Sequence, residues 1–368
     1  MGTQGWVSEE VFSDGNSFFS KLKSDIDKAT FRITLETYIF SDDYLGRSIV
    51  DALNRAARRG VKVRLMVDGV GSALSSILFL SQCLDPRIKF RVYHPLPWFI
   101  IFSPLRIFPP LTHFLKYLFS LNRRNHRKTC IIDGRIAWVG GMNISSDQLI
   151  WRDTGLRVEG KEVRALTRAF SSTWIRAGFG MPRKSNLRPS LLVRLNDTWA
   201  LRSRLYRDLL KRISNATKKI WITNAYFVPH LSLVKALCEA ANRGVEVKIL
   251  VPQNCDLFFV PLVRAVYYNE LLKSGAKIYE YVPTMLHSKT IIIDGWAMLG
   301  SSNLNHRSLN HDLEADIVMT HDRCKKQLVS QFLSDIERSI EVNFDYLKKR
   351  SWMQTSSGQA LLLLKNWM

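Results

Sequence analysis

"NHRKTCIIDG" at residues 125–134 returns almost unchanged as "LHSKTIIIDG" at residues 286–295. Each copy holds a histidine followed two residues later by a lysine: His126 and Lys128 in the first, His287 and Lys289 in the second. Side chains at positions i and i+2 of a β-strand lie on the same face of the sheet. The repeat therefore predicts two strands that each present an imidazole and an ammonium group side by side.

The end of each copy predicts a hairpin. Asp133 and Asp294 each precede a glycine, and Asp-Gly is a preferred pair for a type I′ turn. A returning strand follows and ends in "GGMN" or "GSSN", whose last residues are Asn143 and Asn303. Each hairpin should therefore return its asparagine to its own histidine and lysine. Turn geometry is a sufficient reason for the two aspartates, and we expect them to have a structural role.

A longer repeat surrounds the decapeptides. "RITLETYIFSDDYLGRSIVDALNRAARRGVKVRLMVDG" (32–69) resembles "IWITNAYFVPHLSLVKALCEAANRGVEVKILVPQN" (220–254). Each segment has an apolar strand with a tyrosine, an Ala-rich amphipathic helix that ends at Arg-Gly, and a second apolar strand. Gly60 and Gly244 suit the position just after a helix, where the backbone needs a positive φ. The pattern predicts a βαβ unit with parallel strands and a right-handed crossover.

The repeat also predicts the architecture. A further strand follows each βαβ unit, at residues 89–95 and 277–283. We expect an α/β fold of two pseudo-twofold-related halves, each a mixed β-sheet flanked by α-helices. The halves are placed at residues 1–180 and 181–368, joined by the Gly-, Pro- and Arg-rich linker at 176–192.

The repeated polar groups point to phosphate chemistry. Lysine and asparagine donate hydrogen bonds to anionic oxygens, and histidine can attack or protonate a reacting group. Neither half holds a second catalytic group for its own histidine, so both halves should surround one phosphate. The candidates for binding that phosphate are Lys128, Asn143, Lys289 and Asn303.

A carboxylate follows each histidine at the same interval. Asp153 lies 27 residues after His126, and Glu314 lies 27 residues after His287. A carboxylate at this place could accept the second imidazole N–H, fix the tautomer and raise the basicity of the ring. The alternative is two ordinary acidic residues in similar strands.

Composition limits the partners. The chain of 368 residues has 53 Lys and Arg against 32 Asp and Glu, a formal charge of +21. Such a surface attracts polyanions, either nucleic acid or an anionic membrane. The five cysteines have no metal-ligand spacing, so we expect reduced thiols and no metal site.

At this point the sequence resembles a known family. HxKxxxxD followed by GxxN, in two copies, is the signature of the phospholipase D superfamily. The segments "LETYIF", "LNRAARRGVKVRLMVDGVGS" and "LHSKTIIIDGWAMLGSSNLNHRS" are similar to bacterial cardiolipin synthases of that superfamily. The similarity covers nearly all of residues 15–345 and is closest to the type that lacks N-terminal transmembrane helices.

The resemblance implies a metal-free reaction in two steps. Its catalytic residues would be His126, Lys128, Asp133, His287, Lys289 and Asp294. His126 would attack the lipid phosphorus and form a phosphatidyl-histidine, while His287 would protonate the leaving alcohol and later deprotonate the acceptor. The pseudo-symmetry leaves the opposite assignment open.

Two positions depart from the repeat or from the family. Gly141 stands where the second copy has Ser301, which removes one hydroxyl donor. Asn305 stands where relatives often carry Asp. Neither belongs to the core set, so we expect them to affect head-group preference at most.

An insertion favours lipid over nucleic acid as the substrate. Residues 96–122, dense in Trp, Phe, Ile and Leu, occur only in the first half. Their prolines make a poor transmembrane helix, and their cations are typical of an interfacial membrane element. The basic amphipathic segment at 347–368 could form a second membrane contact. A nuclease would need a groove open to a charged backbone, so no nucleic-acid partner is expected.

The sequence therefore predicts a phosphatidyltransferase that makes cardiolipin from two phosphatidylglycerol molecules and releases glycerol. It should be peripheral on the cytoplasmic face of the bacterial cell membrane, bind anionic phospholipid and need no cofactor. Alternatives are a phospholipase D, a transferase that uses another donor or acceptor such as phosphatidylethanolamine, and a metal-independent nucleic-acid phosphodiesterase. A non-catalytic binder of anionic membranes would have no need of two complete His–Lys–Asn sets.

Overall fold

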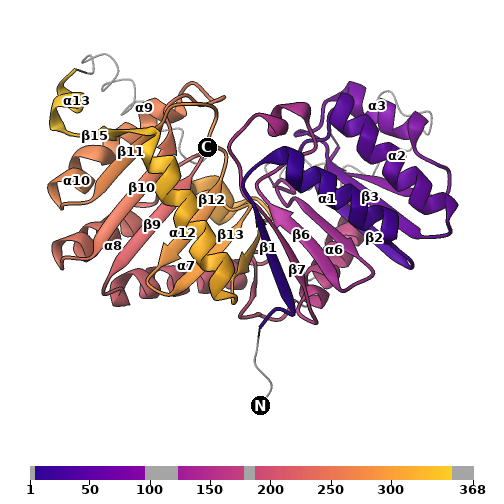
Figure 1. Ribbon diagram of the computed structural model, residues 1–368, viewed down its shortest axis with the longest axis horizontal. Helices are drawn as coiled ribbons and strands as arrows, with labels where there is room; N and C mark the ends of the chain where they lie inside the picture. Colours follow the sequence, from indigo (N-terminus) through magenta and orange to yellow (C-terminus); the bar gives the residue numbers. More distant parts are fainter. Residues whose placement is uncertain (1–4, 96–122, 178–186, 350–368) are drawn as a thin grey trace, which may run out of the picture.

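The computed structural model describes residues 5–95, 123–177 and 187–349, which form two mixed sheets side by side (Figure 1). The first sheet has the strand order β1-β7-β6-β5-β2-β3-β4. The second has the order β15-β11-β10-β9-β12-β13-β14-β8. Read in opposite directions the two orders correspond strand by strand, with β15 as an addition at one edge. The predicted two-half α/β architecture is confirmed.

The strands and helices have the following bounds. The strands of the first sheet are β1 (Ser8–Phe12), β2 (Arg32–Thr37), β3 (Lys62–Asp68), β4 (Lys89–Tyr93), β5 (Thr129–Ile132), β6 (Ile136–Gly140) and β7 (Gly155–Glu159). Those of the second are β8 (Val193–Leu195), β9 (Lys219–Asn224), β10 (Glu246–Pro252), β11 (Lys277–Tyr281), β12 (Lys289–Ile293), β13 (Trp296–Gly300), β14 (Ala315–Val318) and β15 (Ser339–Val342). The helices of the first half are α1 (Gly15–Lys28), α2 (Tyr44–Arg58), α3 (Leu74–Cys83), the short 3₁₀ turn η1 (Ser146–Leu149) and α6 (Val163–Arg176). Those of the second are α7 (Trp199–Asn215), α8 (Leu231–Asn242), α9 (Val260–Arg264), η2 (Ala265–Tyr267), α10 (Tyr268–Lys273), α11 (His306–Asn310), α12 (Asp322–Glu337) and α13 (Phe344–Lys348).

Both predicted βαβ units are present. β2 pairs in parallel with β3 across α2, and β9 pairs in parallel with β10 across α8. Gly60 and Gly244 follow these helices with φ of 93° and 87°. The next amide in each copy, Val61 or Val245, donates back to a carbonyl in the last helical turn at 3.1 Å. This is a Schellman cap, and it explains why both helices end at Arg-Gly.

The two hairpins differ by one residue. Asp133 and Gly134 both have positive φ (51° and 68°), as a type I′ turn requires, and Arg135 is added before the strand resumes. The second hairpin closes with Asp294 and Gly295 alone, and only Asp294 has a positive φ, of 49°. The type I′ prediction is therefore wrong for the second hairpin, whose shorter connection adopts a different turn.

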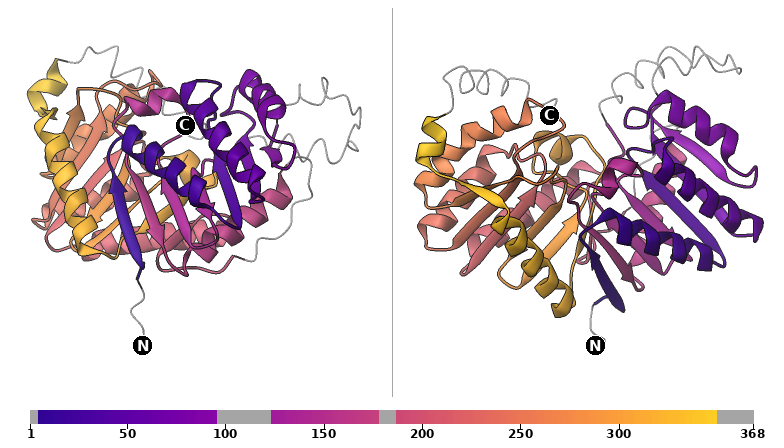
Figure 2. Two further views of the ribbon diagram at one scale, coloured as in Figure 1. Left: turned by 45° about the vertical axis from the view of Figure 1, so that its right-hand side comes forward. Right: turned by 45° about the horizontal axis from the view of Figure 1, so that its top comes forward.

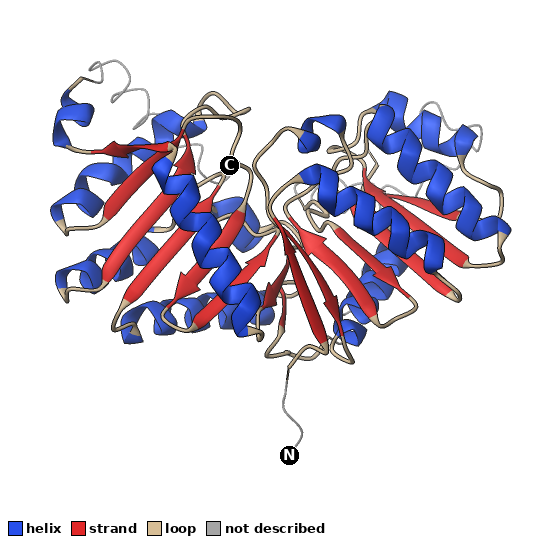
Figure 3. Ribbon diagram, in the orientation of Figure 1, coloured by secondary structure: helices blue, strands red, loops and turns tan. Residues whose placement is uncertain are grey.

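Helices cover both faces of each sheet (Figure 3). Ile132 and Trp138 point to the face of the first sheet that α1 and α2 cover. Ile131 and Val139 point to the opposite face, because successive side chains on a strand alternate. The core on that second face is continuous with the core of the second half. The two halves therefore share buried apolar surface, which holds them in a defined relation.

The halves meet along the strands that carry the repeated motif. β6 and β7 lie against β13 and β14 near the centre of the molecule (Figures 1 and 2). At the N-terminus, the Trp6 indole N–H donates to Val318 O at 3.0 Å, and Glu9 accepts from the Thr320 amide at 2.6 Å. These contacts tie the first strand to the second half.

Arg127 joins the two halves inside the protein. Its guanidinium is fully buried, forms an ion pair with Asp197, and donates to Thr173 Oγ1 and to Glu314 O, both at 3.2 Å. Arg176 also pairs with Asp197, at 3.3 Å. A buried charge without its partner is strongly unfavourable, so this ion pair makes the relation of the halves sensitive to either residue.

Several predicted segments lie outside the described residues. These are the apolar insertion at 96–122, most of the linker and nearly all of the C-terminal segment. The division at 180 also falls there and stays a prediction. Within the described ranges, no helix is long and apolar enough to cross a membrane.

Arg127→Met should lower the free energy of unfolding by about 3–5 kcal/mol, because it leaves the Asp197 carboxylate buried against one guanidinium fewer. Urea denaturation measures the change. The double variant Arg127→Met/Asp197→Leu removes both charges and should recover part of the loss. A double variant no more stable than the single one would assign the effect to packing instead of charge.

Candidate active site

The motif residues of each half gather at one edge of its sheet. His126 and Lys128 come directly before β5, Asn143 follows β6, and Asp153 comes before β7. β5, β6 and β7 are antiparallel neighbours, so these three positions share an edge. The second half repeats the arrangement with β12, β13 and β14.

Each histidine is paired with the carboxylate of the other half. His126 Nδ1 lies 3.0 Å from both oxygens of Glu314, and His287 Nδ1 lies 2.7 Å from Asp153 Oδ2. The backbone is crossed in the same way, since the His126 amide donates to Leu313 O at 3.0 Å. The sequence predicted the two carboxylates but did not indicate that each would serve the opposite half.

The two carboxylates differ in their support. Glu314 accepts from the hydroxyls of Ser301 at 2.5 Å and Ser308 at 2.6 Å. At the position equivalent to Ser301, a Cβ on Gly141 would come within 2.3 Å of Asp153 Oδ1. The shorter aspartate holds its carboxylate closer to the backbone, in the space that a serine would need. The first half therefore has Gly141 beside the shorter Asp153, and the second half has room for Ser301 beside the longer Glu314.

Burial lowers the pKa of both histidines. The pKa of His126 is well below its usual value because the ring is buried and Lys128 lies near it. The pKa of His287 is also lowered, by burial and by Lys289, although Asp153 opposes the shift. Both rings are therefore neutral near pH 7, and the hydrogen bond through Nδ1 leaves Nε2 with the lone pair. The proton on Nδ1 is inferred from the carboxylate partner.

The lysines are buried beside the histidines. Lys128 Nζ donates to His126 O at 2.7 Å, and Lys289 Nζ donates to His287 O. Burial lowers the pKa of Lys128 to about 7 and that of Lys289 to about 8. Nearby Glu314 and Asp153 work against this lowering. An anion bound between the two ammonium groups would restore their charge, so they are suited to hold a phosphate.

Aromatic rings line the site and were not assigned a role from the sequence. The Tyr38 ring lies edge-on to His126 at 5.0 Å, and the Tyr226 ring lies edge-on to His287 at 5.9 Å. Trp151 is 5.5 Å from the His287 ring. The matching place of the tyrosines in the two βαβ repeats was a usable signal, whereas nothing in the pattern indicated Trp151.

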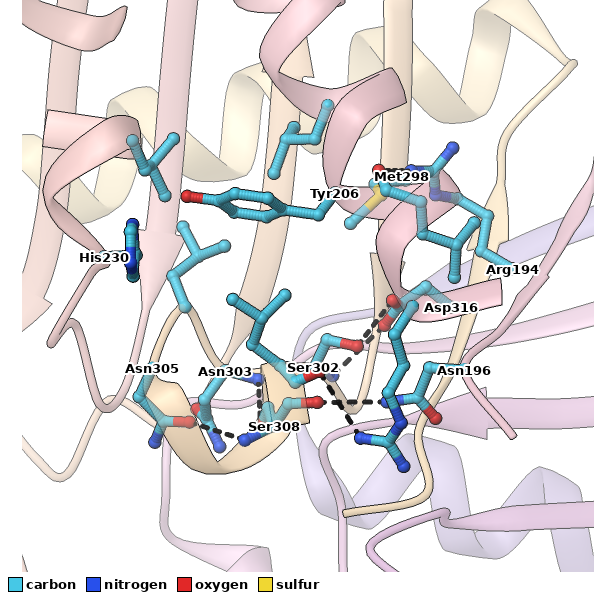
Figure 4. Close-up of a pocket in the computed structure, with 16 residues that line it drawn as sticks. Arg194, Asn196, Tyr206, His230, Met298, Ser302, Asn303, Asn305, Ser308 and Asp316 are labelled. Carbon is cyan, nitrogen blue, oxygen red and sulfur yellow. Dashed lines mark hydrogen bonds between the residues drawn. The ribbon is translucent and has the colours of Figure 1, made fainter. Parts of the chain in front are cut away.

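The two asparagines have different partners. Asn143 Oδ1 accepts from the Ile39 amide at 3.1 Å, which leaves its NH₂ group to donate elsewhere. Asn303 Oδ1 is buried and has no hydrogen-bond partner among the described residues. Asn303 lies at the side of a cavity of about 80 Å³ whose opposite wall includes Tyr206 and Met298 (Figure 4).

Asn305 caps a helix. Its side-chain oxygen accepts from the Ser308 amide at 2.9 Å, at the start of α11. Asp and Asn serve about equally well at this position, so the departure from the family pattern has a structural explanation.

Asp133 and Asp294 lie away from the histidines, at the opposite ends of β5 and β12. Their carboxylates accept backbone N–H groups at 2.8–3.0 Å, from Thr30, Phe31 and Arg32 in the first half and from Thr217, Lys218 and Lys219 in the second. They tie each hairpin to the start of the neighbouring strand. We assign them this structural role in place of the catalytic role that the resemblance implied.

Among the described residues, no group of three or more His, Cys, Asp or Glu side chains is arranged to hold a metal ion. Lysine, asparagine and imidazole groups of the kind described above can bind a phosphodiester and transfer protons to or from it.

Comparison with known proteins agrees with this geometry. A family profile described as "Cardiolipin synthase, PLD-like domain" matches residues 22–174 and 209–336. The chain belongs to the phospholipase D-like cardiolipin synthase family. A cardiolipin synthase of Halalkalibacterium halodurans is 33% identical over 367 residues, which cover 94% of this chain and 69% of that protein. The major cardiolipin synthase of Bacillus subtilis is 32% identical and covers 97% of this chain and 74% of that protein.

Solved structures share the fold at low sequence identity. Phosphatidylserine synthase of Haemophilus influenzae aligns with a TM-score of 0.68 and 13% identity, over 98% of this chain and 95% of that one. Polyphosphate kinase of Porphyromonas gingivalis aligns with a TM-score of 0.63 and 14% identity, over 98% of this chain and 56% of that one. This family member therefore has the two-half fold seen in both.

Asp133→Ala should lower the free energy of unfolding by about 1–3 kcal/mol, because several backbone N–H groups lose a charged acceptor. The activity of the folded fraction should change by less than about tenfold, which is 1.4 kcal/mol in the barrier. Asp133→Asn, which keeps one acceptor, is the matched control. A stable Asp133→Ala variant without activity would restore the catalytic role.

The ratio kcat/KM for a phosphodiester substrate should fall as pH rises through about 7 to 8, where Lys128 and Lys289 lose their charge in the free enzyme. A bound phosphate keeps both lysines protonated, so kcat should stay constant over this range. Lys128→Arg keeps its charge and should move the start of the alkaline fall from about pH 7 toward about pH 8, where Lys289 titrates. A pH profile of kcat/KM that stays flat to about pH 10 would contradict the lowered lysine pKa values.

Proposed function

We propose that this protein joins two phosphatidylglycerol molecules into cardiolipin and releases glycerol. The observation that supports this most directly is the crossed pairing of His126 with Glu314 and of His287 with Asp153. It brings one imidazole from each half to a common site that also holds two buried lysines. The names of the related proteins support the choice of lipid.

In the first step His126 is the nucleophile. Its Nε2 attacks the phosphorus of the donor lipid, the N–P bond forms and the bond from phosphorus to the glycerol oxygen breaks. Glu314 accepts the Nδ1–H and stabilises the positive charge that develops on the ring. His287 enters this step as the imidazolium, which the bound anionic phosphate stabilises, and gives its Nε2 proton to the leaving glycerol oxygen while Asp153 holds its Nδ1–H.

In the second step the roles of His287 are reversed. As a neutral base it takes the proton from a glycerol hydroxyl of the acceptor lipid. That oxygen attacks phosphorus, the N–P bond breaks, and His126 leaves as a neutral imidazole. One phosphodiester replaces another, so the balance is two phosphatidylglycerols to one cardiolipin and one glycerol.

Four donors hold the reacting phosphate. We assign Lys128, Lys289, Asn143 and Asn303 to its non-bridging oxygens, which gain charge in the transition state. Both lysines are buried, and electrostatic stabilisation is larger where water is excluded. Exclusion of water also favours a lipid alcohol over hydrolysis.

The partner surface in this proposal is an anionic phospholipid membrane on its cytoplasmic face. The formal charge of +21 attracts such a surface. No metal and no nucleic acid take part in the proposed reaction. A phosphodiesterase acting on nucleic acid would use the same histidines, and a substrate test separates the two.

Purified protein with phosphatidylglycerol vesicles in chelator should form cardiolipin, and His126→Ala or His287→Ala should reduce the rate by at least about 10³-fold. Single-stranded DNA is incubated in parallel, and products are separated by mass spectrometry. Cleavage of DNA without lipid turnover would overturn the proposal. Phosphatidic acid as the main product would make the protein a phospholipase.

A donor whose leaving group is p-nitrophenol should distinguish the two histidines. Nitrophenolate leaves without a proton, so His287→Ala should still give a burst of nitrophenolate while His126→Ala gives none. Stopped-flow absorbance measures the burst. The reverse result would exchange the two roles.

A further inference from the structure

The surroundings of the site are not symmetric. Three arginines and a histidine gather on the His126 side of the shared site: Arg123, Arg202, Arg307 and His311. The backbone at 123–126 runs alongside 311–314, with the Leu313 amide donating to Arg124 O at 2.8 Å. Arg123 therefore lies three residues from the nucleophile, next to the loop that carries Glu314.

Further contacts hold the group around α11. Arg307 pairs with Asp312 at 2.9 Å, and Arg202 donates to the carbonyls of Leu309 at 3.4 Å and His311 at 3.1 Å. Arg123 is exposed, while Arg202 and Arg307 are partly exposed. The group thus reaches solvent, and the carboxylates that offset part of its charge are Asp312, Glu314 and Asp197.

The cations repel one another. Burial and then Arg123 lower the pKa of Arg202, and burial followed by Arg307 and Arg202 lowers the pKa of His311. Arg307 also lowers the pKa of His126, although burial, the two active-site lysines and His287 have larger effects on it. Like charges held this close are unfavourable unless an anion joins them.

The pseudo-twofold shows that the fold does not require this charge. The position three residues before His287 is Thr284, which corresponds to Arg123. When α1 and α7 are aligned by their C-cap residues, Ala29 and Ala216, the residue equivalent to Arg202 is Gly15. When Asn143 is aligned with Asn303, the residue equivalent to Arg307 is Asp147. When Asp153 is aligned with Glu314, the residue equivalent to His311 is Ile150. None of these counterparts is cationic.

We propose that Arg123, Arg202, Arg307 and His311 bind the phosphate of a second phosphodiester, that of the acceptor lipid. This rests on the proposed function, in which two anionic lipids react and only one phosphate is attacked. In the product a three-carbon bridge separates the two phosphates, so a site for the unreacted one must adjoin the histidines. Guanidinium groups recognise phosphate oxygens through paired hydrogen bonds.

Competition between two acceptors tests this site. Arg123→Gln and Arg307→Gln are assayed in phosphatidylglycerol vesicles that also contain ethanol, which has no phosphate. The ratio of cardiolipin to phosphatidylethanol should fall about tenfold in each variant, as loss of a charged hydrogen bond predicts. Arg58→Gln removes an exposed charge from α2 and should leave the ratio at its wild-type value.

The outcomes separate two failures. If the wild-type protein makes both products and the variants keep its ratio, the acceptor site is wrong and the proposed function stands. A parallel loss of both products would assign the cations to general membrane attraction and also overturn the site. If the wild-type protein makes phosphatidylethanol but no cardiolipin, the proposed function fails and the acceptor site with it. Arg123 is exposed, so its variant keeps the test valid if Arg307→Gln does not fold.

Discussion

Two crossed hydrogen bonds, from each histidine to the carboxylate of the opposite half, are the constraint on which this site depends. Their lengths, 3.0 Å and 2.7 Å, leave little freedom for one half to move against the other. Two features hold the halves in fixed positions: the apolar core that both halves share and the buried Arg127–Asp197 ion pair. The site therefore forms only where the two halves meet, because each half needs a carboxylate from the other to orient its imidazole.

A symmetric scaffold here carries chemically different groups. Glu314 has two serine hydroxyls to support it, whereas Asp153 lies against Gly141, where no side chain fits. The cationic group around α11 belongs to one side only, and Trp151 belongs to the other. The proposed transfer reaction would use such differences, since its nucleophile and its acid perform different steps on one phosphate. The repeat supplies the paired groups, and the residues that differ between the copies distinguish them.

Burial decides the electrostatics of the site. Ammonium groups taken out of water hold a proton less strongly, which is why the pKa of Lys128 falls to about 7 even with Glu314 near it. The same burial keeps the histidines neutral, the form in which one can attack and the other can act as a base. A bound phosphate would restore the lysine charges, so the site is suited to an anion.

Local sequence patterns are enough to predict the two-half architecture, the βαβ units, the helix ends at Gly60 and Gly244, and the gathering of histidine, lysine and asparagine at one sheet edge. All of these follow from local periodicity and turn chemistry, which neighbouring residues specify. The sequence also identified Asp153 and Glu314, but not that they cross between halves. That exchange, the different second turn, the Gly141 contact and the one-sided cationic group were decided by the tertiary structure. They depend on how the two halves pack against each other, and the distances between residues far apart in the chain are set by that packing and not by sequence spacing.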